Sequence, residues 1–98
     1  MAYQIVIKKR FTKKVLKVLG YLEKEWSAKV AAEFLIKIDR RIELLKKQPY
    51  AGSPSEKIKD VRGLLITRHN RLYYKIKNEH VIILNMYDTR MNPKKNPY

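Results

Sequence analysis

The sequence predicts an α+β fold in which an N-terminal strand and an αα-hairpin precede a three-stranded antiparallel meander, all in one sheet. Three patterns support this prediction: apolar residues recur with helical spacing between residues 11 and 45, polar and apolar residues alternate over 71–77, and 80–87 is almost continuously apolar. Helices grouped before strands are typical of α+β domains, with the helices packed on one face of the sheet. At 98 residues, the chain is expected to form a single domain, 1–98.

The N-terminal half predicts a short strand followed by two amphipathic helices. Tyr3–Lys8 is rich in β-branched residues, as expected of a strand. One apolar stripe begins at residue 11, and Ser27 is a good N-cap for a second helix that ends before Pro49. The short connection between the helices predicts an antiparallel αα-hairpin. Three aromatic side chains of this hairpin are expected in the core: Phe11, Trp26 and Phe34.

The C-terminal half predicts a loop, three strands and a tail. Prolines and glycine punctuate the loop over 48–60, and the strands are expected at 61–67, 71–77 and 80–87. The apolar run of the last strand indicates burial on both faces and a central or well-covered position in the sheet. Residues 88–98, which contain two prolines and several cations, are expected to form an exposed basic tail.

Charge is the strongest compositional signal. The chain has 23 Lys and Arg against 9 Asp and Glu, a formal net charge of +14. Such a surface attracts polyanions, so a nucleic-acid, ribosomal or acidic protein partner is expected. The alternative is a cationic surface that serves only solubility. No apolar run approaches the about 20 residues that span a bilayer, and no cysteine is present, so we expect a cytoplasmic protein without a membrane partner.

Several classes of site are disfavoured by the residues present. The two histidines lack cysteine or a second-histidine spacing that would hold a transition metal, and the glycines form no phosphate-binding loop. No serine lies in a nucleophile elbow. We therefore expect neither a metal nor another cofactor.

Cations and tyrosines interleave along the predicted sheet, and this pattern is the main functional signal. Arginine binds phosphate through two hydrogen bonds, and tyrosine offers a surface on which an unpaired base stacks. The combination favours single-stranded RNA over a duplex. Ordinary solvated surface charge is the alternative interpretation. The candidate RNA-binding residues are Arg68, His69, Tyr73, Lys75, Lys94 and Lys95, beside Arg62, Arg71 and Arg90.

The order of elements, the loop QPYAGSP, the strand start Arg71-Leu72-Tyr73-Tyr74 and the ending Tyr87–Pro93 together resemble the RelE/ParE superfamily. This superfamily comprises the small basic toxins of bacterial type II toxin–antitoxin systems, and the resemblance covers essentially the whole chain. It implies that a cognate acidic antitoxin, partly disordered when free, folds on binding this chain.

The resemblance implies one of two activities. RelE-like members cleave mRNA in the ribosome without a metal, through attack of the 2′-hydroxyl on the adjacent phosphate, whereas ParE-like members inhibit DNA gyrase without catalysis. We expect a ribosome-dependent mRNA endonuclease; the alternatives are a gyrase inhibitor and an inactive RNA-binding relative.

By resemblance to the cleaving branch, the candidate catalytic residues are Arg71, Arg90, Arg62 and Tyr98. Arg71 matches the arginine of the RLxY strand, and Arg90 lies within one residue of the second arginine. The cleaving branch has two lysines spaced two residues apart; Arg62 stands at the position of the first, and Leu64 at the position of the second. Three candidates for the general base remain: His69, Tyr98 and a lysine with a lowered pKa.

Overall fold

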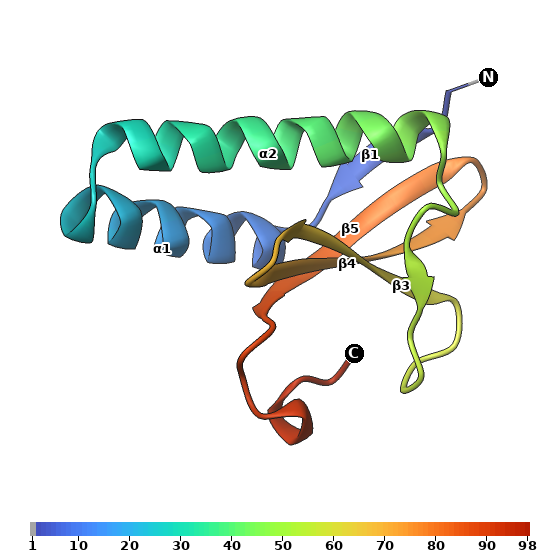
Figure 1. Ribbon diagram of the computed structural model, residues 1–98. Helices are drawn as coiled ribbons and strands as arrows, with labels where there is room; N and C mark the ends of the chain where they lie inside the picture. The colour runs from blue at the N-terminus through green and yellow to red at the C-terminus, as the bar shows by residue number, and fades with distance from the viewer. Residues whose placement is uncertain (1) are drawn as a thin grey trace.

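Two antiparallel helices cover one face of a five-stranded sheet in the computed structural model, which describes residues 2–98 (Figure 1). The predicted α+β class is confirmed. In chain order the elements are β1 (Gln4–Ile7), α1 (Lys9–Glu25), α2 (Ala28–Lys47), β2 (Ser53–Pro54), β3 (Val61–Thr67), β4 (Asn70–Lys77), β5 (His80–Asp88) and the short 3₁₀ helix η1 (Pro93–Lys95). Neither helix of the described chain is long and apolar enough to cross a membrane.

The sheet is mixed: the three-stranded meander is antiparallel, as predicted, and the N-terminal strand joins it in parallel. Its strand order is β1-β5-β4-β3-β2, and β1 runs parallel to β5 while all other neighbours are antiparallel. The long connection through both helices and the meander brings β5 beside β1 in the same direction, as parallel pairing requires. The predicted central position of the apolar strand is confirmed, because β5 lies between β1 and β4. The loop over 48–60 contributes β2, a two-residue edge strand.

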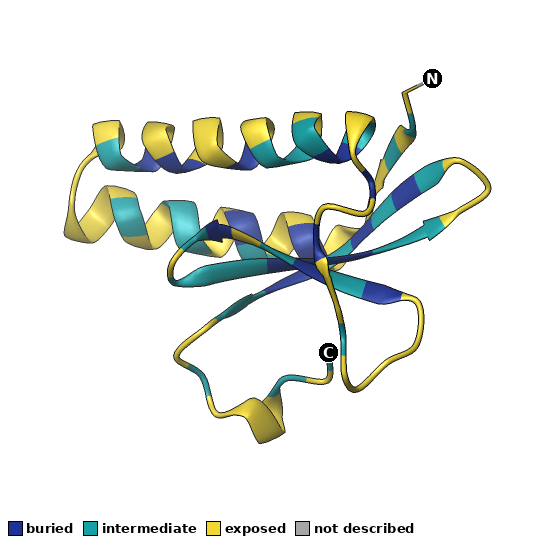
Figure 2. Cartoon of the chain, turned by 45° about the vertical axis from the view of Figure 1, so that its right-hand side comes forward, coloured by how far each residue is buried: buried dark blue, intermediate teal, exposed yellow. Residues whose placement is uncertain are grey.

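The alternation along β4 sorts its side chains between the two faces of the sheet. Leu72 pairs with Leu64 and Met86 in the neighbouring strands, and these side chains belong to the core beneath the helices. Arg71 and Tyr73 alternate with these residues along β4 and so point to the other face. The helices leave this face of the sheet uncovered (Figure 1). Figure 2 shows that the sheet-facing sides of both helices are buried and that their outer sides are exposed.

The αα-hairpin has the predicted helix boundaries but not all of the predicted core. The hydroxyl of Ser27 accepts a hydrogen bond from the backbone N–H of Val30 at 3.1 Å, which confirms the N-cap. Phe11 and Phe34 are buried as expected, whereas Trp26 is 70% exposed. Trp26 is the C-cap of α1 and has a non-helical backbone, so the helical spacing that placed it on the apolar stripe no longer sets its direction.

Tyr74 ties the loop after α2 to the centre of the sheet. Its side chain is fully buried, and its hydroxyl donates a hydrogen bond to Pro49 O at 2.7 Å and accepts one from Gly52 N at 2.9 Å. Burial raises the pKa of this phenol. A Cβ at Gly52 would lie 2.7 Å from the Tyr74 hydroxyl and 2.8 Å from Gly63 O, so only glycine allows this approach.

Removal of the Tyr74 hydroxyl should therefore destabilise the fold. We expect Tyr74→Phe to lower the free energy of unfolding by about 1–3 kcal/mol, because a buried N–H and a carbonyl lose their partner. Urea denaturation measures the difference. Tyr50→Phe is the matched control, since Tyr50 is exposed and its hydroxyl makes no hydrogen bond within the described chain. Equal stability of the two variants would contradict this role of Tyr74.

Candidate functional site

A cleft of about 360 Å³ opens on the face of the sheet opposite the helices. Its floor comprises residues of β3, β4 and β5, and the loop residues 53–57 form one wall. The chain after β5 turns back across this face, so that Asn96 and Tyr98 form the other wall. The segment expected to be a simple exposed tail is thus folded against the sheet, although Lys94, Lys95 and Pro97 are exposed.

Three tyrosines meet in the cleft. The rings of Tyr73 and Tyr98 stack with centroids 5.0 Å apart and an interplanar angle of 18°. The Tyr87 ring packs beside both, with its centroid 6.3 Å from that of Tyr73 and 5.9 Å from that of Tyr98. Tyr73 is only 9% exposed as a result, although its place in β4 predicts a solvated side chain. Planar aromatic faces of this kind are the surfaces on which nucleobases stack.

Arg71 is the arginine that lies in this cleft. It pairs with Leu65 and Tyr87 in the flanking strands and is half-buried. Gly63 provides the space, because a Cβ there would lie 3.0 Å from Cδ of Arg71 and 3.1 Å from Cε1 of Tyr73. Arg71, Tyr73 and Tyr98 are therefore the predicted site residues that the fold brings together.

Arg62 lies on the opposite face, which corrects the prediction that it shares a surface with Arg71. The β3–β4 register pairs Arg62 with Tyr74, so its side chain points to the helix side of the sheet. There it donates a hydrogen bond to Gly52 O at 2.7 Å and lies over the ring of Tyr50, with Cζ 5.0 Å from the centroid. Leu64 also faces the core, so a lysine at this position would not reach the cleft in this register.

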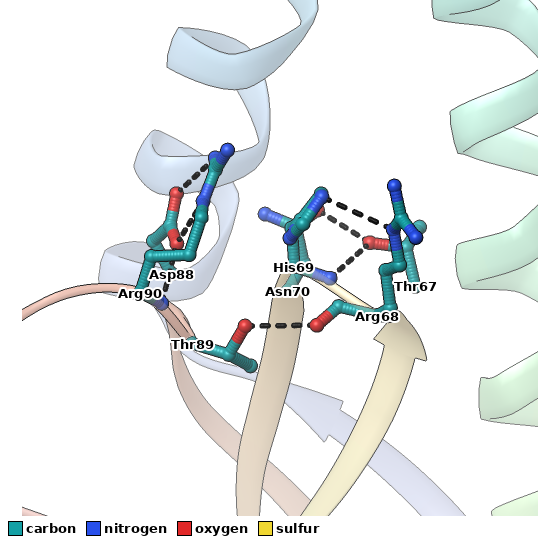
Figure 3. Close-up of polar contacts among 7 residues, drawn as sticks. All are labelled: Thr67, Arg68, His69, Asn70, Asp88, Thr89 and Arg90. Atoms are coloured by element: carbon teal, nitrogen blue, oxygen red, sulfur yellow. Dashed lines mark hydrogen bonds and ion pairs between the residues drawn. The ribbon is translucent and has the colours of Figure 1, made fainter.

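Arg90 is held outside the cleft by Asp88 (Figure 3). Its Nε and Nη2 donate hydrogen bonds to the two carboxylate oxygens at 3.0 and 2.7 Å. These hydrogen bonds, chiefly the one from the side chain of Arg90, lower the pKa of Asp88 from 3.8 to about 2, and nearby His69 contributes less.

The two residues predicted in the β3–β4 turn form a local network rather than a cleft wall. Arg68 Nε donates to His69 Nε2 at 3.2 Å, and the Thr89 hydroxyl donates to the Arg68 carbonyl at 2.8 Å (Figure 3). Among the remaining predicted RNA contacts, Lys75 is half-buried on β4, and Lys94 and Lys95 are exposed on η1.

The structure adds residues that the sequence pattern did not single out. Lys14 of α1 places its Nζ 4.0 Å from the centroid of Tyr87, and burial, followed by the charge of Lys17, lowers its pKa. Lys57 and Ser55 of the loop contact the backbone of the C-terminal segment. Lys14 lies next to the apolar stripe of its helix, and this position is only a weak sequence indication that it contacts the sheet. The loop contacts join residues that are too distant in sequence for a local pattern to reveal them.

Over residues 2–98, no group of three or more His, Asp or Glu side chains is placed to hold a metal ion. The lining of the cleft comprises the guanidinium of Arg71, the phenol rings of Tyr73, Tyr87 and Tyr98, and the carboxylates of Glu56 and Asp88. The guanidinium can bind an anionic group, and the phenol rings can stack on an aromatic one.

A basic chain with an αα-hairpin on one face of a small mixed sheet defines the RelE/ParE class of toxins. The family model for the ParE toxin of the type II toxin–antitoxin system parDE matches residues 5–93. The chain belongs to this ParE toxin family. A toxin of a type II system has an antitoxin partner.

Solved structures agree on the fold. The chain is similar to one of the chromosomal ParDE system from P. aeruginosa, with a TM-score of 0.77 and 17% identity over 89% of this chain and 96% of that one. It is also similar to the isolated E. coli RelE toxin, with a TM-score of 0.60 and 13% identity over 96% of this chain and 92% of that one. The chain is similar as well to the YoeB dimer from Staphylococcus aureus, with a TM-score of 0.59 and 14% identity over 89% of this chain and 97% of that one. No curated protein sequence matches the chain.

The Arg90–Asp88 pair predicts a pH response at the end of β5. Because the folded state depresses the pKa of Asp88, the stabilisation from this carboxylate is present above pH 3.8 and is lost as the pH falls through about 2. Arg90→Ala should raise the pKa of Asp88 toward 3.8, as followed by NMR titration of its carboxyl carbon. Arg68→Ala is the control and should leave it near 2. An unchanged pKa in Arg90→Ala would contradict the pairing.

Proposed function

We propose that this toxin arrests growth by binding DNA gyrase rather than by cleaving mRNA. The observation that carries the proposal is the separation of the cations expected to act together. Arg62 and Arg71 lie on opposite faces of the sheet, and Arg90 is paired with Asp88. Catalysis of phosphoryl transfer needs several groups fixed around one phosphate, and this arrangement does not supply them.

Membership of the ParE family supports the same proposal. The family model spans nearly the whole chain, and gyrase is the target that the resemblance to ParE-like members implies. We further propose that the toxin acts in the cytoplasm and that its antitoxin is acidic, since a chain of net charge +14 attracts an anionic partner.

The outer surface of the αα-hairpin supports a protein partner. It exposes large apolar side chains that the fold does not use: Leu16 is 62% exposed, Tyr21 59%, Trp26 70% and Ile36 49%. Exposed aromatic residues are frequent anchors of protein–protein interfaces. We therefore propose that the gyrase-binding surface lies on this hairpin.

The purified toxin should inhibit supercoiling by DNA gyrase and leave mRNA intact in a purified translation reaction. Trp26→Ser should weaken gyrase inhibition by about tenfold or more, because aromatic anchors contribute a large share of binding. Tyr50→Ser is the matched control, since Tyr50 is an aromatic residue outside the hairpin and is 62% exposed, against 70% for Trp26. Absence of gyrase inhibition by the wild-type toxin, or mRNA cleavage by it, would contradict the proposal.

A ribosome-dependent mRNA endonuclease is the second candidate, and the cleft favours it. Arg71 could neutralise a phosphate there while Tyr73 and Tyr98 stack on bases. Tyr98 and Lys14 are the candidates for the general base, since His69 is held in the β3–β4 turn.

This candidate predicts that Arg71→Ala lowers mRNA cleavage on the ribosome by about 10²-fold or more, as loss of one electrostatic contact to the transition state does in other enzymes. Primer extension maps the mRNA ends. Arg40→Ala removes the same charge from the exposed surface of α2 and should have no effect. Undiminished cleavage by Arg71→Ala would exclude this role for the cleft.

A further inference from the structure

The segment Asn92–Tyr98 forms a strap across the open face of the sheet (Figure 1). Lys57 fastens it, because its ammonium group donates to the carbonyl oxygens of Pro93 and Asn96. Ser55 adds a hydrogen bond from its hydroxyl to the backbone oxygen of Tyr98. The loop after β2 and the end of the chain thus close on each other over the cleft.

The strap covers the aromatic floor of the cleft. Tyr98 stacks on the face of Tyr73, and the amide of Asn96 donates a hydrogen bond to the Tyr73 hydroxyl at 3.0 Å. These contacts leave Tyr73 only 9% exposed. A ligand that stacks on Tyr73 must therefore displace the ring of Tyr98.

The strap is attached weakly enough to open. Its contacts are exposed or part-buried hydrogen bonds and the ring contacts of Tyr98 with Tyr73 and Tyr87, and none of its side chains belongs to the hydrophobic core. Lys94 and Lys95 are exposed along it. Segments with few buried apolar contacts open locally without global unfolding.

The occupant that fits the exposed floor is an unpaired nucleobase with its phosphate. A base has the flat face that Tyr98 presents to Tyr73, and Arg71 lines the same cleft. In the closed cleft the carboxylate of Glu56 accompanies Arg71, and the ammonium of Lys57 is occupied by carbonyls. Opening releases Lys57 and leaves the cations of the strap at the rim.

We propose that the strap is an autoinhibitory contact in which Tyr98 occupies a stacking site on Tyr73 that a base of single-stranded nucleic acid takes when the Lys57 contacts release. The inference goes beyond gyrase as the target, because it concerns a different surface from the αα-hairpin. It also gives Tyr98 a role opposite to that of a substrate-stacking residue, since its removal should strengthen binding.

Fluorescence anisotropy with a short labelled oligouridylate at fixed salt tests whether removal of the Tyr98 ring strengthens or weakens nucleic-acid binding. Tyr98→Ala should bind about fivefold or more tightly than the wild type, since a base gains a stack that an intramolecular ring otherwise occupies. Tyr50→Ala, which removes an exposed tyrosine outside the cleft, should bind as the wild type does. Unchanged or weaker binding by Tyr98→Ala would overturn the proposal.

Hydroxyl-radical labelling of Tyr73, measured by mass spectrometry, tests without any ligand whether the Lys57 contacts hold the strap over Tyr73. Labelling should rise several-fold in Lys57→Met and Tyr98→Ala. Lys59→Met removes the same charge from an exposed position of the same loop. In this control variant, labelling of Tyr73 should stay at the wild-type level. Strong labelling of Tyr73 in the wild type, or no rise in that labelling in Lys57→Met, would overturn the proposal that Lys57 holds the strap closed. Neither readout depends on gyrase, so failure of the two proposals is distinguishable.

Discussion

The pairing register between β3 and β4 is the constraint on which the rest of the structure depends. Side chains alternate between faces along each strand, so a slip of one residue would exchange the two faces completely. In the observed register, Leu64 lies beside Leu72 under the helices, and Gly63 lies beside Tyr73 on the open face. The hydroxyl of Tyr74, bound to the loop after α2, holds the same register from outside the sheet.

The two faces of the sheet are closed by different kinds of interaction. The helices bury an apolar layer, and hydrophobic burial of this kind is difficult to reverse locally. The strap closes the other face with hydrogen bonds and stacked tyrosines, which water and a ligand can replace. The helix-covered half of the molecule thus positions the cleft, and the strap controls access to it in the autoinhibition that we propose.

The fold itself does not select a target. Chains of the ParDE system, RelE and YoeB match this chain in fold at 13–17% identity. Function depends on the side chains of a site rather than on the fold. In this chain, Arg71 keeps a position in the cleft, whereas Arg62 serves the loop after α2 and Arg90 serves Asp88. Cations that make such structural contacts are less available to a substrate.

The sequence by itself determined the helices, the meander and the apolar face of β4, because helical spacing and strand alternation are local patterns. It also determined the charge that points to an anionic partner. Only the tertiary structure decided that β1 runs parallel to β5, that Arg62 faces away from Arg71, and that Tyr98 covers Tyr73. Each of these depends on register or on contacts between distant segments, whose energies no local window of sequence contains.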